Sequence, residues 1–218
     1  MKYKLVIFDL DGTLVNTIAD LGAATNEALR VKGLPGHSLE EYRGMVGNGV
    51  RKLVMRAMPE AMREDEQAVD ALLEVFLAYY IDHIDERSRP YPGMPELLAE
   101  LQAKGVLLGV ASNKFQAGVE KLVGRMFPDI RFTTVLGSRP GAPLKPDPAV
   151  VEEIRTQAGV SVQETVMVGD SATDVATAAN AGVACVAVSW GFRTRTELGD
   201  APQIVDTASE LRALLLAE

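Results

Sequence analysis

The chain has 218 residues, enough for one ordinary domain or for a core with a modest insertion, and its 47% apolar and 24% charged residues are typical of a soluble globular protein. Its formal net charge of −8 at pH 7 argues against nonspecific binding to nucleic acid and against attachment to an anionic membrane surface. The single cysteine, Cys185, excludes an intrachain disulfide, and no apolar run approaches the roughly 18 residues that a membrane-spanning helix needs. We therefore expect a cytoplasmic protein.

The first predicted element is a short strand over residues 5–8, where the run Leu-Val-Ile-Phe is apolar throughout and indicates burial on both faces. From Thr17 to Tyr80 apolar residues recur at spacings of three and four, which predicts helices and no strand. Helices alone after a first strand indicate a small inserted domain. We expect an α/β core over residues 1–15 and 87–218, and a helical domain over residues 16–86.

Strand and helix patterns alternate from residue 90 onward. The expected strands cover residues 106–111, 132–136, 165–168, 184–188 and 204–206. The expected helices cover residues 94–104, 116–126, 149–158 and 174–181, with a last helix that ends at 216. This alternation is typical of parallel strands joined by helical crossovers. The predicted fold class is therefore α/β, with a doubly wound parallel sheet.

Four polar clusters fall at or just after the carboxyl ends of predicted strands, which a parallel sheet brings to one edge. They are Asp9 with Asp11, Ser112 with Asn113, Lys145, and Asp170 with Asp174. Each cluster alone is an ordinary turn or helix cap, but together they assemble several carboxylates, a lysine and a hydroxyl. Crowded carboxylates favour a divalent cation, and ligands that are all oxygen suit Mg²⁺. The lysine and the hydroxyl can bind phosphate oxygens, so the set predicts metal-assisted phosphoryl transfer.

These clusters resemble, in the same order, the four motifs of the haloacid dehalogenase-like hydrolase superfamily. The matching residues are Phe8-Asp9-Leu10-Asp11-Gly12-Thr13-Leu14, Ser112-Asn113-Lys114, Lys145-Pro146 and Gly169-Asp170-Ser171-x-x-Asp174. The helical insert resembles the small α-helical cap of that family. The resemblance covers essentially the whole chain and implies a Rossmann-like core, Mg²⁺ as cofactor and a phosphatase acting on a small phosphorylated metabolite.

The resemblance also implies roles for individual residues. Asp9 would be the nucleophile that forms an aspartyl-phosphate, and Asp11 would be the general acid and then the general base. Mg²⁺ would be held by Asp9, by the backbone carbonyl of Asp11 and by Asp170, with Asp174 supporting these ligands from behind.

The remaining implied roles concern the phosphate group. Ser112, Asn113 and Thr13 would bind its oxygens, and Lys145 would contact both Asp9 and the phosphate.

Within the insert, the residues Val46-Gly47-Asn48-Gly49-Val50 resemble the glycine-containing cap loop of phosphoglycolate phosphatases. A helix N-terminus followed by cations can receive a second anionic group, so Asn48 and Arg51 are candidate contacts for a substrate carboxylate. The alternative is an ordinary capped helix exposed to solvent.

Other functions stay open at this stage. A sugar phosphomutase similar to β-phosphoglucomutase, or a pyrophosphatase of the same superfamily, would share all four clusters. A phospho-accepting regulatory domain fits less well, because it gains little from the acid/base Asp11. A dinucleotide-binding domain is excluded by the lack of a glycine-rich turn after the first strand. We expect no nucleic-acid or membrane partner, and either a monomer or a homodimer.

Overall fold

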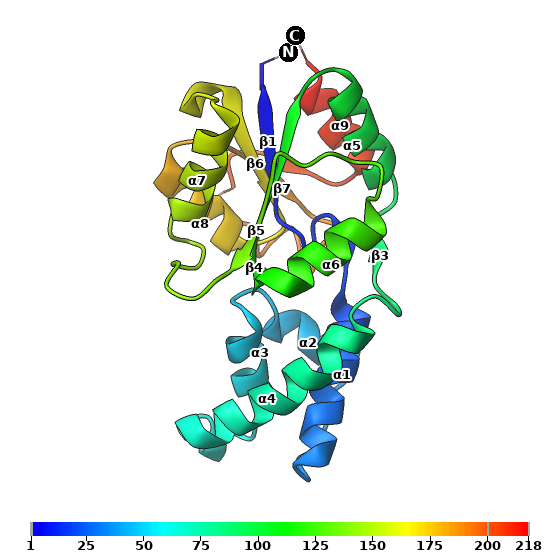
Figure 1. The fold of residues 1–218 in the computed structure, drawn as a ribbon, viewed down its shortest axis with the longest axis vertical. Helices are drawn as coiled ribbons and strands as arrows, with labels where there is room; N and C mark the ends of the chain where they lie inside the picture. Colours follow the sequence, from blue (N-terminus) through cyan, green and yellow to red (C-terminus); the bar gives the residue numbers. More distant parts are fainter. Residues whose placement is uncertain (1, 200, 218) are drawn as a thin grey trace.

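The computed structural model describes residues 2–199 and 201–217, and its centre is a six-stranded parallel sheet with the order β5-β4-β1-β6-β7-β8 (Figure 1). The strands are β1 (Leu5–Phe8), β4 (Leu107–Phe115), β5 (Thr134–Ser138), β6 (Thr165–Gly169), β7 (Ala184–Val188) and β8 (Ile204–Val205). Neighbouring strands all pair in parallel. The predicted α/β fold with a doubly wound sheet is confirmed.

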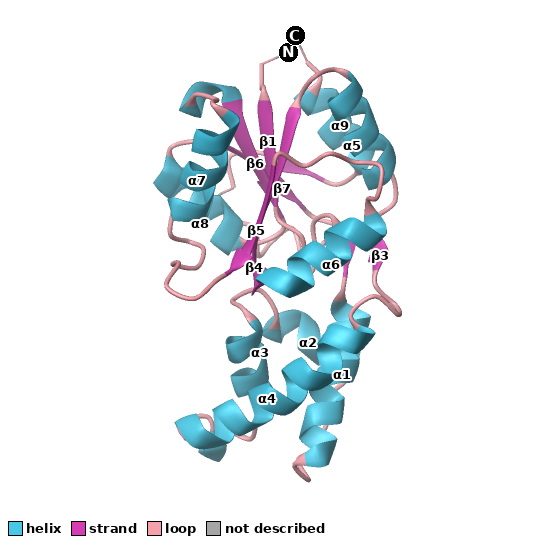
Figure 2. Cartoon of the chain, in the orientation of Figure 1, coloured by secondary structure: helices cyan, strands magenta, loops and turns pink. Residues whose placement is uncertain are grey.

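Helices cover both faces of this sheet, as the colouring by secondary structure makes plain (Figure 2). They are α5 (Met94–Ala103), α6 (Gln116–Met126), α7 (Ala149–Ala158), α8 (Ala172–Ala181) and α9 (Ala208–Leu215). The central strand explains why both faces are apolar. Leu5 and Ile7 pack with residues of α7 and α8, whereas Val6 and Phe8 pack with residues of α5, α6 and α9. Alternate residues of one strand therefore serve two cores.

The helical insert lies beyond the carboxyl edge of the sheet, between β1 and β4 in the sequence. Its helices are α1 (Ile18–Val31), α2 (Leu39–Met45), α3 (Val50–Ala57) and α4 (Glu66–His83), with a short 3₁₀ turn at Glu60–Met62. Its buried residues belong to the same hydrophobic cluster as α5, α6 and α9. The insert is therefore packed against the core.

A two-stranded antiparallel sheet joins the insert to the core. It consists of β2 (Val15–Asn16) and β3 (Arg89–Pro90), with Val15 opposite Pro90. The buried Asp20 fixes the same junction, because its carboxylate accepts hydrogen bonds from the backbone N–H groups of Arg87 and Ser88 and from the Ser88 hydroxyl. The sequence did not predict this pair of strands, since two-residue strands show no periodicity. The domain limits at residues 16 and 86 remain a prediction.

Three differences from the predicted element boundaries are larger than one residue. Strand β4 runs to Phe115, with irregular register after Ala111, so Ser112 and Asn113 lie within the strand. Strand β5 lies two residues later than expected. Helix α8 begins at Ala172 because the Ser171 side chain caps it, and Asp174 therefore lies in its first turn.

Candidate active site

The register of the sheet brings the predicted site residues together. Phe8 lies opposite Val110 of β4 on one side and Val168 of β6 on the other, and the Asp9 N–H donates to the Val168 carbonyl at 2.9 Å. The three aligned residues Phe8, Val110 and Val168 are each followed, within two positions, by a predicted site residue: Asp9, Ser112 and Asp170. The chain runs from β1 to β4 and β5 on one side and then crosses to β6, β7 and β8 on the other. Asp9 therefore stands where the strand order reverses, the usual ligand position of such sheets.

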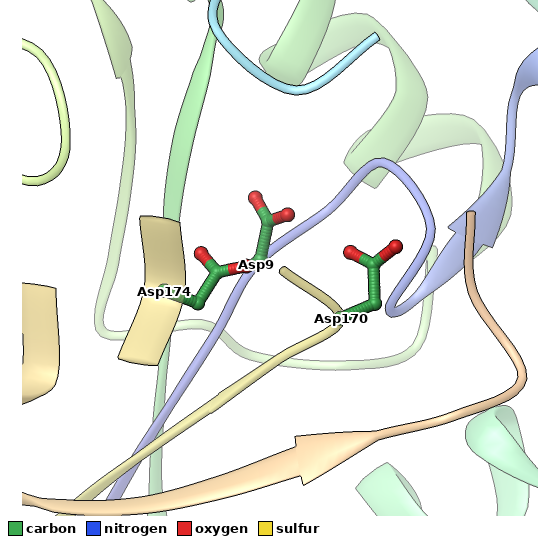
Figure 3. A group of neighbouring side chains, drawn as sticks. All are labelled: Asp9, Asp170 and Asp174. Carbon is green, nitrogen blue, oxygen red and sulfur yellow. The ribbon is translucent and has the colours of Figure 1, made fainter. Parts of the chain in front are cut away.

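Three aspartates form a compact group at this edge. Carboxylate oxygens of Asp9, Asp170 and Asp174 lie within 4.8 Å of one another, and all three residues are buried. In Figure 3 the carboxylates of Asp9 and Asp170 extend to the same side from the ends of neighbouring strands, and both residues line one cavity. Burial and the charges of the other two aspartates raise the pKa of Asp9 well above its usual range. Burial, followed by repulsion from Asp174, raises the pKa of Asp170 to about 7.

Lys145 supplies the positive charge of this group. Its Nζ donates to Asp9 at 2.8 Å, to Asp174 at 2.7 Å and to the carbonyl of Ala111 at 2.8 Å. Burial alone would lower the pKa of Lys145, but the charges of Asp174 and Asp9 outweigh it and the pKa is raised. The lysine therefore stays charged and offsets one of the three carboxylates. Two remain without a cation in the described part of the chain.

The three carboxylates differ in how many protein donors they already accept. Asp174 accepts Lys145 on one oxygen and both the N–H and the hydroxyl of Ser171 on the other. Asp170 accepts Thr13 at 3.2 Å and the Phe192 N–H at 2.8 Å, one donor on each oxygen. Among described residues, the second oxygen of Asp9 accepts no donor. Asp9 and Asp170 thus retain more capacity for a ligand than Asp174 does.

These residues fit a hard divalent cation. The donor set consists of oxygens only, carries more negative charge than its lysine offsets, and is buried at a strand edge. Glycines keep the space around Asp170 open. A Cβ on Gly12 or on Gly191 would come within 2.3 Å of the Asp170 side chain. Gly12 also has φ near +90°, which other residues rarely adopt. The buried aspartate group is therefore consistent with a Mg²⁺ site.

Asp11 is held by side chains that the sequence analysis did not single out. The buried Lys114 donates to its two oxygens at 2.9 and 3.2 Å, and the Thr17 hydroxyl donates to it at 2.6 Å. Lys114 also donates to the hydroxyl of Tyr80, on α4, at 2.8 Å. Tyr80 and Thr17 thus link the insert to Asp11. The sequence did offer one indication that Lys114 belongs to the site, because it directly follows Ser112 and Asn113 in the same motif.

The residues predicted to bind phosphate are in place at the strand ends, but two of their side chains are used internally. Asn113 exchanges two hydrogen bonds with the backbone of Lys145, at 2.8 and 3.0 Å, and so positions that lysine. Thr13 donates to Asp170, as described above. Ser112 lines the cavity over Asp9. The phosphate-binding roles of all three remain predictions.

A cavity of about 40 Å³ lies directly over Asp9 and Asp11. Six residues of the insert line it: Leu21, Val46, Gly47, Gly49, Val50 and Leu53. The cations that line it are Lys114, Lys145 and Arg193, of which the last follows β7 and was not singled out from the sequence. A space of this size holds only a few water molecules, so the insert covers the site closely.

Asn48 and Arg51 do not line this cavity. Both border a larger neighbouring cleft of about 560 Å³, which also touches Asn113 and Lys145. The Asn48 side chain donates to Thr173 at 3.3 Å and accepts from Arg56 at 2.7 Å. Arg51 forms exposed ion pairs with Glu66 and Asp70 of α4. Their predicted contact with a substrate carboxylate remains a prediction, and in this conformation neither side chain reaches the space above Asp9.

Residues 6–188 match the family model described as haloacid dehalogenase-like hydrolase. The chain therefore belongs to the haloacid dehalogenase-like hydrolases, and the resemblance drawn from the four motifs is confirmed. The protein is accordingly an enzyme, and the expectation of a phosphatase is confirmed at the level of this family and its relatives.

Its relatives narrow the group further. The phosphoglycolate phosphatase of Mesorhizobium japonicum is 35% identical over 219 residues, which cover 100% of this chain and 96% of the relative. That of Pseudomonas syringae pv. tomato is 38% identical over 192 residues, or 87% of this chain and 70% of the relative.

Solved structures show the same fold over the full chain. The crystal structure of a candidate phosphoglycolate phosphatase from Lactobacillus delbrueckii subsp. bulgaricus has a TM-score of 0.94 at 37% identity, with 100% of both chains covered. A predicted phosphoglycolate phosphatase from Haemophilus somnus gives 0.90 at 30% identity, with 98% of each chain covered. The inserted helices therefore correspond to a cap, and we use that name below. Within the described residues, no helix is both long and apolar enough to cross a membrane.

Proposed function

We propose that the protein is a Mg²⁺-dependent phosphomonoester hydrolase that works through an aspartyl-phosphate on Asp9, with phosphoglycolate as the first candidate substrate. The observation that carries the proposal is the environment of Asp9. One of its oxygens is held by Lys145, the other accepts no donor among the described residues, and Asp9 lines the cavity under the cap. A nucleophile needs this combination of a fixed position and a free lone pair.

In the proposed first step, the free oxygen of Asp9 attacks phosphorus while the bond between phosphorus and the leaving oxygen breaks. Asp11 gives its proton to the departing alkoxide. In the second step, Asp11 takes a proton from water, the water oxygen attacks the aspartyl-phosphate, and Asp9 is released with inorganic phosphate. Asp11 lies at the same cavity, where Lys114 and Thr17 fix its carboxylate. General acid–base help of this kind contributes typically about 10²–10⁴-fold.

The cation would be held by Asp9 and Asp170, with the backbone carbonyl of Asp11 as a third proposed ligand. When bound, Mg²⁺ offsets negative charge on the carboxylates and on the transferring phosphate. Asp174 would act on these ligands indirectly, because it fixes Lys145 through a 2.7 Å hydrogen bond. Thr13 and the Phe192 N–H orient Asp170.

The size of the cavity and the names of the relatives support a small substrate. The cavity of about 40 Å³ over Asp9 includes the position of the phosphate, so it suits a short leaving group better than a sugar. Two relatives that match most or all of this chain are phosphoglycolate phosphatases. The larger cleft beside Lys145 is the part of the structure that a phosphomutase or a longer substrate would use.

The test is phosphate release from a panel of phosphoglycolate, hexose phosphates and pyrophosphate, with Mg²⁺ and after exhaustive chelation. We expect release from phosphoglycolate that disappears with EDTA and returns with added Mg²⁺. Full activity without a divalent cation would contradict the metal-dependent part. Isomerised sugar phosphate without net phosphate release would favour the mutase instead.

A further inference from the structure

The loop that follows β7 contacts three separate parts of the site. Trp190 donates its indole N–H to the carbonyl of Thr13 at 3.1 Å, and the Phe192 N–H holds Asp170. The next side chain, Arg193, leaves the core and donates to the carbonyls of Arg43 and Val46 in the cap. Val46 belongs to the segment that covers Asp9. Arg193 therefore stands between the core and the cap, at the wall of the cavity.

Arg193 differs from the other cations at this cavity in its partners. Lys145 pairs with Asp9 and Asp174, and Lys114 pairs with Asp11. The donors of Arg193 reach neutral backbone carbonyls, and within residues 2–199 and 201–217 it forms no ion pair. The Arg193 side chain is half-buried at the cavity wall. It is thus the one cation of the cavity wall whose charge the described residues leave unmatched.

The charged groups near Arg193 also leave its positive charge unmatched. Burial lowers the pKa of Arg56, and the nearby charge of Arg193 lowers it further, so two cations face the same region. Glu197 follows Arg193 in the same loop, but its carboxylate accepts the N–H and the hydroxyl of Thr194, both at 2.8 Å. Those hydrogen bonds account for most of the lowered pKa of Glu197, and Arg193 adds only a small part. Among the described residues, neither Glu197 nor any other carboxylate forms an ion pair with Arg193, so the guanidinium is available to an anionic ligand.

We propose that Arg193 binds a second anionic group, such as a carboxylate, on the leaving portion of the substrate. The proposal rests on the proposed function and names its substrate class: short phosphomonoesters that carry another negative charge. The phosphate end of such a molecule would lie at Asp9, Ser112 and Lys145, and its other end would meet the guanidinium at the cap. Arg51, the cation expected from the sequence, already pairs with Glu66 and Asp70 outside this cavity.

The experiment compares two substrates that differ only in the second charge. Ethyl phosphate has a methyl group where 2-phosphoglycolate has a carboxylate. We expect wild type to prefer phosphoglycolate, and Arg193→Gln to lower its kcat/KM by about 10- to 150-fold, the usual effect of losing a charge-assisted hydrogen bond. The value for ethyl phosphate should stay within about threefold. Arg193→Lys should recover part of the preference, since it restores the charge without the planar fork.

Arg195→Gln is the matched control. It removes the same type of side chain from the same loop, but Arg195 is exposed, pairs with Asp206 and does not line the cavity. It should leave the ratio of the two substrates unchanged. Melting temperatures of all variants separate a folding defect from a change in recognition. Equilibrium binding of both compounds gives the same comparison without turnover.

Several outcomes would overturn the inference. Equal losses on both substrates would mean that Arg193 only holds the cap in place. If Arg51→Gln lost the preference for phosphoglycolate over ethyl phosphate and Arg193→Gln kept it, the second anionic group would bind at Arg51 in α3 instead. Wild type that hydrolyses ethyl phosphate and phosphoglycolate equally well would refute the inference while leaving the phosphatase intact. Absence of Mg²⁺-dependent release from either compound would instead refute the proposed function, and the binding comparison would then still decide on Arg193.

Discussion

At the scale of single residues, the two aspartates of the first motif are distinguished by their partners. Asp9 shares Lys145 with Asp174 inside the buried group, whereas Asp11 is held by Lys114 and Thr17 at the side facing the cap. This division matches the separate roles proposed for them, because one must attack phosphorus while the other exchanges protons with the leaving group and with water.

Substitution of the two aspartates should therefore give different phenotypes. Asp9→Asn should abolish both turnover and formation of the phosphoenzyme, since the amide is a poor nucleophile. Asp11→Asn should still form a phosphoenzyme from an aryl phosphate, whose leaving group needs little acid help, and should hydrolyse it slowly. Mass spectrometry of the acid-quenched protein measures both. A phosphoenzyme that persists in Asp9→Asn would place the nucleophile elsewhere.

Lys114→Met should impair catalysis through Asp11. With its main cationic partner gone, Asp11 keeps only the Thr17 hydroxyl, and kcat on an alkyl phosphate should fall by at least about tenfold, a fraction of the full acid–base contribution. An aryl phosphate should lose much less. Lys121→Met is a suitable control, because Lys121 donates to the Ile81 carbonyl, pairs with Asp85 and does not line the cavity. Equal losses on both types of substrate would argue against this role.

At the scale of elements, two segments of the chain connect the cap to the core, and hydrogen bonds of Asp20 hold these two segments together. Its buried carboxylate, in the first turn of α1, accepts three donors from Arg87 and Ser88 beside β3. The short strands β2 and β3 pair immediately next to it. Helix α1 therefore starts from a fixed point on the core, and this determines where α4 places Tyr80 relative to Lys114.

Loss of this tie should cost stability. Asp20→Ala leaves buried N–H and O–H groups without an acceptor, which should lower the free energy of unfolding by about 2–3 kcal/mol. Chemical denaturation measures this value. Asp82→Ala provides the comparison, because Asp82 is exposed near the end of α4, and its substitution should change stability by less than about 0.5 kcal/mol. Similar values for the two variants would show that the tie contributes nothing.

At the scale of the whole molecule, stability should depend on pH and metal through the buried aspartates. In the metal-free protein the pKa of Asp170 is about 7 and that of Asp9 is also raised, chiefly through burial. The folded state then binds more protons than the unfolded state, in which both groups titrate near 4. Their contribution to stability is fully present below about pH 4 and is lost as pH rises through about 7.

We therefore expect the melting temperature in EDTA to fall between about pH 5 and pH 7.5, and Mg²⁺ to raise it most at the upper end, where it does not compete with protons. Differential scanning calorimetry with and without Mg²⁺ tests both points. Asp170→Asn should flatten the pH dependence and weaken the response to Mg²⁺. A melting temperature in EDTA that stays constant over this pH range would show that protonation of the buried aspartates does not control stability.

Local sequence patterns predicted most helices and strands and the polar clusters at the strand ends. The apolar run before Asp9, the alternation after residue 90 and the four polar clusters are local patterns, and they predicted the parallel sheet and the site at its edge. They also predicted helices alone in the insert, which α1 to α4 confirm. Side-chain periodicity is set by neighbours within a few positions, so such features can be read without knowing the fold.

Contacts between side chains far apart in the sequence became visible only in the folded chain. Lys114 reaches Asp11 across 103 positions of sequence, and Arg193 reaches Val46 across 147. Arg51 was the cation expected over the substrate, but α3 packs beside α4, where Glu66 and Asp70 pair with it. No local pattern encodes these pairs. The register of β1 against β4 and β6, and the path of the cap from the β2–β3 junction, fix the distances on which each contact depends.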